Sequence, residues 1–213
     1  EIYMAAIFKK PAERLNDAII RAKNASGPNE KITQELRASL NKEMSAVLRT
    51  GDPALVIDAY RTLAFLHCGA GRPDQAVVTL QELSAQDFGQ QEAIDTGLQL
   101  MAASGMTETG LLAISEWFRS IGRLGESAPI LRVAVKERFS RSAALTERLG
   151  DALVASKLLA EGILCYRDAF ELRPEDGPRL AEKLQILIDA LPDNSVGHET
   201  VSYTHLRAHE TPE

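Results

Sequence analysis

Two histidines near the end of the sequence stand at the spacing of a metal site. His205 and His209 are four residues apart, and Glu210 follows the second histidine. On a helix, residues four apart lie on one face, so both imidazoles could bind one zinc ion beside the carboxylate. A metal site also needs elements that hold its ligands in place, and those must come from the rest of the chain.

His67 and Cys68 form a second candidate pair, a base beside a nucleophile. Adjacent residues on a helix point about 100° apart, so this imidazole does not face the thiol, and we expect packing roles. Cys165 is expected to be a small, buried side chain. Carboxylate pairs such as Glu161 and Asp168 are typical of solvated helix faces. The sequence therefore predicts no catalytic residue, no metal ligand and no cofactor.

The composition is typical of a soluble helical protein. The 213 residues are 45% hydrophobic and 25% charged, only 5% are aromatic, and the net charge is −6. A mildly acidic chain without a basic tract does not indicate nucleic-acid binding. No apolar run reaches the ~20 residues that span a bilayer, so we expect no membrane partner. With two distant cysteines and no signal-peptide core, we expect a cytoplasmic protein.

Helical periodicity runs through most of the chain, with Gly, Pro and Asp at the intervening turns. No stretch shows the sustained alternation of a strand, so the sequence predicts an all-α fold. Because the turns are short, consecutive helices should pack as antiparallel neighbours. Ten helices are expected, at about 11–25, 30–49, 52–69, 73–83, 90–104, 108–121, 126–138, 142–156, 159–173 and 178–191.

Three segments repeat one spacing of small and large residues. A small residue in a first helix is followed by another after twelve positions, a large residue after four more and an apolar one after three more. Small residues let antiparallel helices approach closely, and the large ones fill the space between pairs. The positions are Ala64, Ala76, Leu80 and Leu83; Ser115, Ser127, Leu131 and Ala134; and Gly150, Gly162, Tyr166 and Ala169.

The offsets between these segments are unequal. From Ser115 to Gly150 is 35 residues, but from Ala64 to Ser115 is 51, about one and a half repeats. We therefore expect one helix in excess of the pairs, near residues 90–104.

The repeated spacing resembles the tetratricopeptide repeat, a helix-turn-helix unit of about 34 residues. The resemblance covers roughly residues 54–176 and is best in the last segment, where Pro174 closes the repeat. It implies an α-solenoid of stacked antiparallel helix pairs; another helical repeat or an ordinary bundle is the alternative. We expect an N-terminal helical pair in 1–50, the array in 51–192 and a disordered tail in 193–213.

The resemblance also implies a binding groove. In tetratricopeptide arrays the first helix of each pair lines a concave face that binds peptides or partner helices. The positions of this chain that correspond to the family's groove form three pairs. The two residues of each pair are three or four apart, so they lie on one helical face. Because the set contains both acidic and basic residues, the groove would be of mixed charge. The residues are Arg61, Phe65, Glu116, Arg119, Glu147 and Asp151.

The last residues have an origin other than selection for a metal site. Residues 201–210 can be written as the codons GTC TCT TAT ACA CAT CTC CGA GCC CAC GAG, and this string resembles the adapter of a transposase-based sequencing kit. We therefore expect residues 200–213 to be translated adapter without function. We also expect that the natural chain was cut near Glu199 and that the sequence derives from a bacterial sequence fragment.

Two functions follow from these expectations. The first is an interaction scaffold that binds a protein or peptide partner in the concave groove. The second is the N-terminal docking region of a larger enzyme, such as a glycosyltransferase or sulfotransferase, because bacterial proteins of this architecture often carry such domains after their repeats. We do not expect the fragment itself to be an enzyme.

Overall fold

The computed structural model describes residues 10–24, 30–48 and 52–189. The expected tail of residues 193–213, the adapter-like stretch 200–213, and the triplet His205, His209 and Glu210 all lie outside the described residues.

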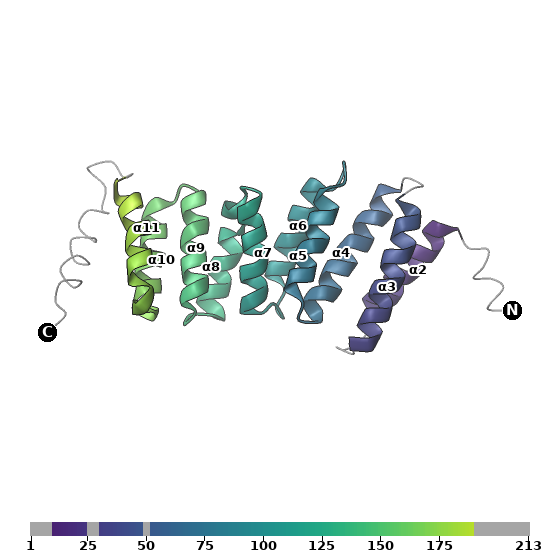
Figure 1. Ribbon diagram of the computed structural model, residues 1–213, viewed down its shortest axis with the longest axis horizontal. Helices are drawn as coiled ribbons and strands as arrows, with labels where there is room; N and C mark the ends of the chain where they lie inside the picture. Colours follow the sequence, from purple (N-terminus) through teal and green to yellow (C-terminus); the bar gives the residue numbers. More distant parts are fainter. Residues whose placement is uncertain (1–9, 25–29, 49–51, 190–213) are drawn as a thin grey trace. The chain divides into compact units, whose positions relative to one another are not determined.

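Within the described ranges the fold is all-α, as predicted, and no strand occurs. Two short 3-10 turns, η1 (Leu124–Ser127) and η2 (Pro174–Asp176), precede α8 and α11. The helix ends fall within about two residues of those expected. The helices are α2 (Pro11–Asn24), α3 (Glu30–Val47), α4 (Pro53–Gly69), α5 (Pro73–Ser84), α6 (Gln90–Ala102), α7 (Glu108–Ser120), α8 (Ala128–Glu137), α9 (Ala143–Ala155), α10 (Leu159–Leu172) and α11 (Gly177–Asp189) (Figure 1).

Local sequence explains where two of these helices begin. The Asp52 carboxylate accepts a hydrogen bond from the Leu55 amide at 3.4 Å, and Pro53 follows at the first helical position. The Ser142 hydroxyl accepts one from the Leu145 amide at 3.1 Å at the start of α9. These side chains satisfy amide groups that have no partner within the first turn of a helix.

The turn inside a helix pair occurs three times with the same geometry. Gly71, Gly122 and Lys157 have positive φ angles of 71°, 72° and 64°. After each, an amide donates at 2.9 Å to the carbonyl five residues back: Arg72 to His67, Arg123 to Phe118 and Leu158 to Leu153. These turns are 51 and 35 residues apart, the same offsets as the sequence repeats. The offsets between the sequence segments are therefore also the offsets between three turns of the same geometry.

By compactness the chain divides into two units, Glu1–Trp117 and Phe118–Glu213, with the boundary inside α7. In the first unit, α2 packs against α3 and α4, α3 against α4, and both α4 and α5 against α6. In the second, α8 packs against α9, α9 against α10 and α10 against α11 (Figure 1). Each unit is thus built from helices that contact their neighbours in sequence.

The twelve positions of the repeated spacing are all buried. At Gly150 a β-carbon would lie 2.7 Å from Tyr166 Cε1, and at Gly162 it would lie 2.7 Å from Val154 Cγ2. Glycine is therefore required where α9 and α10 approach each other, as the spacing predicted. Trp117 and Phe118 are also buried, at 3% and 0% exposure.

Candidate partner-binding surfaces

Three of the six predicted groove residues come together in the second unit. Glu147 and Asp151 lie one turn apart on α9, and Arg119 on α7 forms an ion pair with Asp151. Both carboxylates are largely shielded, with side-chain exposures of 12%. We call this set, with the partners described next, the α9 cluster.

The other partners of these two carboxylates lie on helices α10 and α11 and were not predicted from the sequence. Arg179 donates through both terminal nitrogens to the two oxygens of Glu147, one of them at 2.6 Å. Lys183 Nζ lies 2.8 Å from Glu147 Oε1 and 2.7 Å from Asp151 Oδ1. The Tyr166 hydroxyl on α10 donates to Asp151 Oδ1 at 2.6 Å. The spacing of 32 residues from Glu147 to Arg179, close to one repeat, is the signal that could have identified this pair.

The electrostatics of the α9 cluster follow from these contacts. Burial alone raises the pKa of Glu147, but the hydrogen bonds and charges of Arg179 and Lys183 outweigh it and hold that pKa at about 2. Burial, followed by the hydrogen bond to Asp151, raises the pKa of the Tyr166 hydroxyl. Glu147 is therefore ionised and Tyr166 protonated at neutral pH, and the carboxylates are satisfied by donors of this chain.

The predicted residues of α4 form a different surface in the first unit, which we call the Arg61–Phe65 surface. Arg61 Nη2 lies 3.2 Å from Glu92 Oε2 on α6, but Arg61 Nε is buried and has no hydrogen-bond partner among the described residues. Phe65, one turn along the helix, is 39% exposed. An aromatic ring thus stands at the surface beside a guanidinium with an unused donor.

Glu116, the sixth predicted residue, is exposed on α7 in the first unit. The predicted groove residues therefore belong to two units: Arg61, Phe65 and Glu116 to the first, and Arg119, Glu147 and Asp151 to the second.

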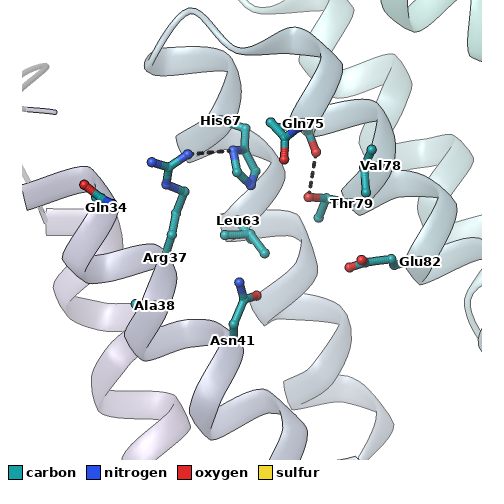
Figure 2. A pocket seen from close by; sticks show the side chains of 10 residues that line it. All are labelled: Gln34, Arg37, Ala38, Asn41, Leu63, His67, Gln75, Val78, Thr79 and Glu82. Atoms are coloured by element: carbon teal, nitrogen blue, oxygen red, sulfur yellow. Dashed lines mark hydrogen bonds between the residues drawn. The ribbon is translucent and has the colours of Figure 1, made fainter. Parts of the chain in front are cut away.

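A groove that the sequence analysis did not predict lies between α3, α4 and α5. It is open to solvent and has a volume of about 330 Å³. Arg37 and Asn41 of α3 and Glu82 of α5 line this space around Leu63 of α4, and the Arg37 guanidinium extends toward His67 (Figure 2). We call it the α3–α5 groove, and its lining residues are Gln34, Arg37, Ala38, Asn41, Leu63, His67, Gln75, Val78, Thr79 and Glu82.

His67 is neutral in this groove. Its burial, followed by the charges of Arg37 and Arg72, lowers its pKa to about 4. Arg37 Nη1 lies 3.4 Å from His67 Nδ1. A guanidinium can only donate, so Nδ1 accepts and the imidazole proton resides on Nε2.

Cys68 adds no nucleophile to the groove, because burial raises the pKa of its thiol to about 11. The second free thiol, Cys165, also has its pKa raised to about 11, chiefly by burial. Both are protonated at neutral pH, whereas a reactive cysteine requires the thiolate.

Over residues 10–24, 30–48 and 52–189 no three His, Cys, Asp or Glu side chains gather as a metal site would require. None of the helices described here combines the length and apolarity needed to cross a membrane. Neither a family model, nor a curated protein, nor a solved structure matches this chain.

Proposed function

We propose that this chain is an interaction scaffold that binds a peptide segment of a protein partner on the Arg61–Phe65 surface. The observation that carries the proposal is an exposed aromatic ring one turn from an arginine whose side chain is 34% exposed. Arginine and aromatic side chains dominate the binding energy of many interfaces. The Arg61 side chain is 34% exposed, so the solvent-facing part of its guanidinium can donate to a partner carbonyl.

The α9 cluster is the less favourable surface for a partner. Its carboxylates are 12% exposed and already accept hydrogen bonds from Arg119, Tyr166, Arg179 and Lys183. A partner would have to displace these donors before it could bind, and would recover little by doing so. Of the predicted groove residues, Arg61 and Phe65 are therefore those we propose for recognition.

A phage-displayed peptide library, selected against the whole chain, tests this function. Enriched peptides should bind Phe65→Ala at least about tenfold more weakly than the wild type, because an interface aromatic is lost. Phe170→Ala is the matched control, since Phe170 is also 39% exposed but lies in the second unit. Peptides that bind Phe65→Ala and the wild type equally well would refute the assignment, as would a selection that enriches none.

A further inference from the structure

The α3–α5 groove lies on the side of α4 away from the Arg61–Phe65 surface. Leu63 and His67, one turn apart, form its floor. Phe65 is two residues from each, which places it about 200° around the helix. Whatever occupies the groove is therefore distinct from a partner bound at Phe65.

The groove has a cationic and an anionic wall. Arg37 extends from α3 and Glu82 from α5, and no ion pair joins them (Figure 2). Among the described residues the Arg37 guanidinium contacts only the neutral His67, at 3.4 Å, which leaves most of its donors available. The carboxylate of Glu82 makes no hydrogen bond or ion pair to any described residue. Two opposite charges thus face one space without neutralising each other.

The remaining lining is rich in groups that recognise amides. Gln34 and Asn41, on the same wall as Arg37, make no side-chain hydrogen bond within the described chain. A primary amide offers both donors and an acceptor, so it can pair with a peptide group. The volume of about 330 Å³ is at the small end of ligand pockets. Charge, hydrogen-bonding groups and size together favour a small, polar ligand with charges at its two ends.

We propose that the α3–α5 groove binds a small zwitterion of the amino-acid or short free-ended peptide class. Its carboxylate pairs with Arg37, its ammonium pairs with Glu82, and Asn41 meets any peptide group between them. A bidentate guanidinium–carboxylate contact supplies geometric specificity at one end. The separation of the two charges selects the ligand length.

Free-ended oligoglycines of increasing length, from glycine to tetraglycine, are the probes. Each is titrated into the full chain while the ring resonance of His67 is followed by NMR; the resonance is assigned by its loss in His67→Gln. We expect saturable shifts with the strongest binding at one length. Acetylation of the amine combined with amidation of the carboxylate should abolish the shifts. An absence of shifts with every length, or equal binding of the doubly capped peptide, would overturn the proposal.

Variants assign the two ends of the ligand. Arg37→Gln and Glu82→Gln should each weaken binding of the best oligoglycine by about tenfold, because each removes a charge-assisted hydrogen bond. Lys42→Gln and Glu35→Gln, exposed positions on α3 outside the groove, are the matched controls and should bind as the wild type does. Unchanged binding by Arg37→Gln or Glu82→Gln would overturn the proposal.

A final probe separates a free zwitterion from charges on a partner's side chains. A capped peptide with one glutamate and one lysine carries both charges but no free ends. If this capped peptide bound more tightly than every oligoglycine, the proposal of a free-ended ligand would be overturned. The groove proposal can fail without the proposed function failing, because the phage selection tests Phe65, which does not line the groove.

Discussion

Glu147 shows how one side chain can serve stability where sequence spacing predicts recognition. Its carboxylate lies on the helix face expected to line a groove, yet Arg179 and Lys183 of α11 cover it. Two positive charges outweigh the cost of its partial burial and keep its pKa at about 2. The helix that carries Glu147 was predicted from the sequence, whereas the contacts of its carboxylate depend on α11, about 32 residues further along the chain.

Replacing Glu147 with glutamine should lower the free energy of unfolding by about 1–2 kcal/mol at pH 7, since a shielded, charge-assisted contact is lost. Glu161→Gln is the control, because Glu161 and its partner Arg132 are about half exposed and their pair should contribute about 0–1 kcal/mol. Urea unfolding of both variants measures the difference.

The pH dependence of the Glu147 contribution has a definite sign. The folded-state pKa of about 2 lies below the ordinary value of 4.5, so the stabilisation is present above pH 4.5 and is lost as the pH falls towards 2. The wild type and Glu147→Gln should therefore converge in stability on acidification. A constant difference from pH 7 to acid would contradict the ion-pair assignment.

At the scale of elements, the turn within a helix pair is the most regular feature. Gly71, Gly122 and Lys157 occupy the same left-handed position, although only two of them are glycine. A side chain there brings its β-carbon close to the backbone, a strain that glycine avoids. The backbone at Lys157 is therefore strained, whereas the equivalent positions in the other two turns are glycine and carry no such strain.

Lys157→Gly should stabilise the protein by about 1 kcal/mol, the strain of a left-handed residue less the entropy that glycine adds to the unfolded chain. Lys42→Gly supplies the contrast: it places glycine inside α3 at an exposed position and should destabilise by about 1 kcal/mol. Thermal unfolding of the two variants gives opposite shifts in Tm if this is correct. A lowered Tm for Lys157→Gly would show that the turn does not impose this strain in solution.

At the scale of the whole molecule, α11 is the last helix that the structure describes, and it packs against α10. Leu180 and Leu187 are 1% and 8% exposed and pack with Ile163 and Tyr166 of α10 in one apolar cluster. The same helix carries Arg179 and Lys183 to the carboxylates of α9. Helix α11 therefore supplies both apolar cover for α10 and two of the three cations that pair with Glu147 and Asp151.

Deletion of residues 177–213 should lower the Tm strongly and increase the binding of an apolar dye. Burying one leucine contributes about 1.5–3 kcal/mol, and the deletion also leaves Glu147 and Asp151 without two of their cations. Deletion of residues 190–213 alone is the control, since it retains α11, and we expect it to melt like the full chain. Equal Tm values for the two truncated chains would mean that α11 does not support this unit.

Periodic features were predictable from the sequence and long-range contacts were not. Helix ends follow from local capping and turn residues, and the close approach of α9 and α10 follows from Gly150 and Gly162. The α3–α5 groove could not be foreseen, because it depends on the distance at which three helices settle, which no local pattern encodes. Glu147 was predicted without its partners, because only the spacing of 32 residues, close to one repeat, relates it to Arg179 in the sequence.

Trp117 is the only tryptophan in the chain, is 3% exposed, and is the last residue of the first unit. Its emission consequently reports one locality of the protein, whereas far-ultraviolet circular dichroism averages over all the helices. Superimposable denaturation curves from the two signals would mean that the repeats melt as one cooperative block. Curves with different midpoints would mean that parts of the protein unfold separately, as repeat proteins do when the coupling between neighbouring repeats is weak.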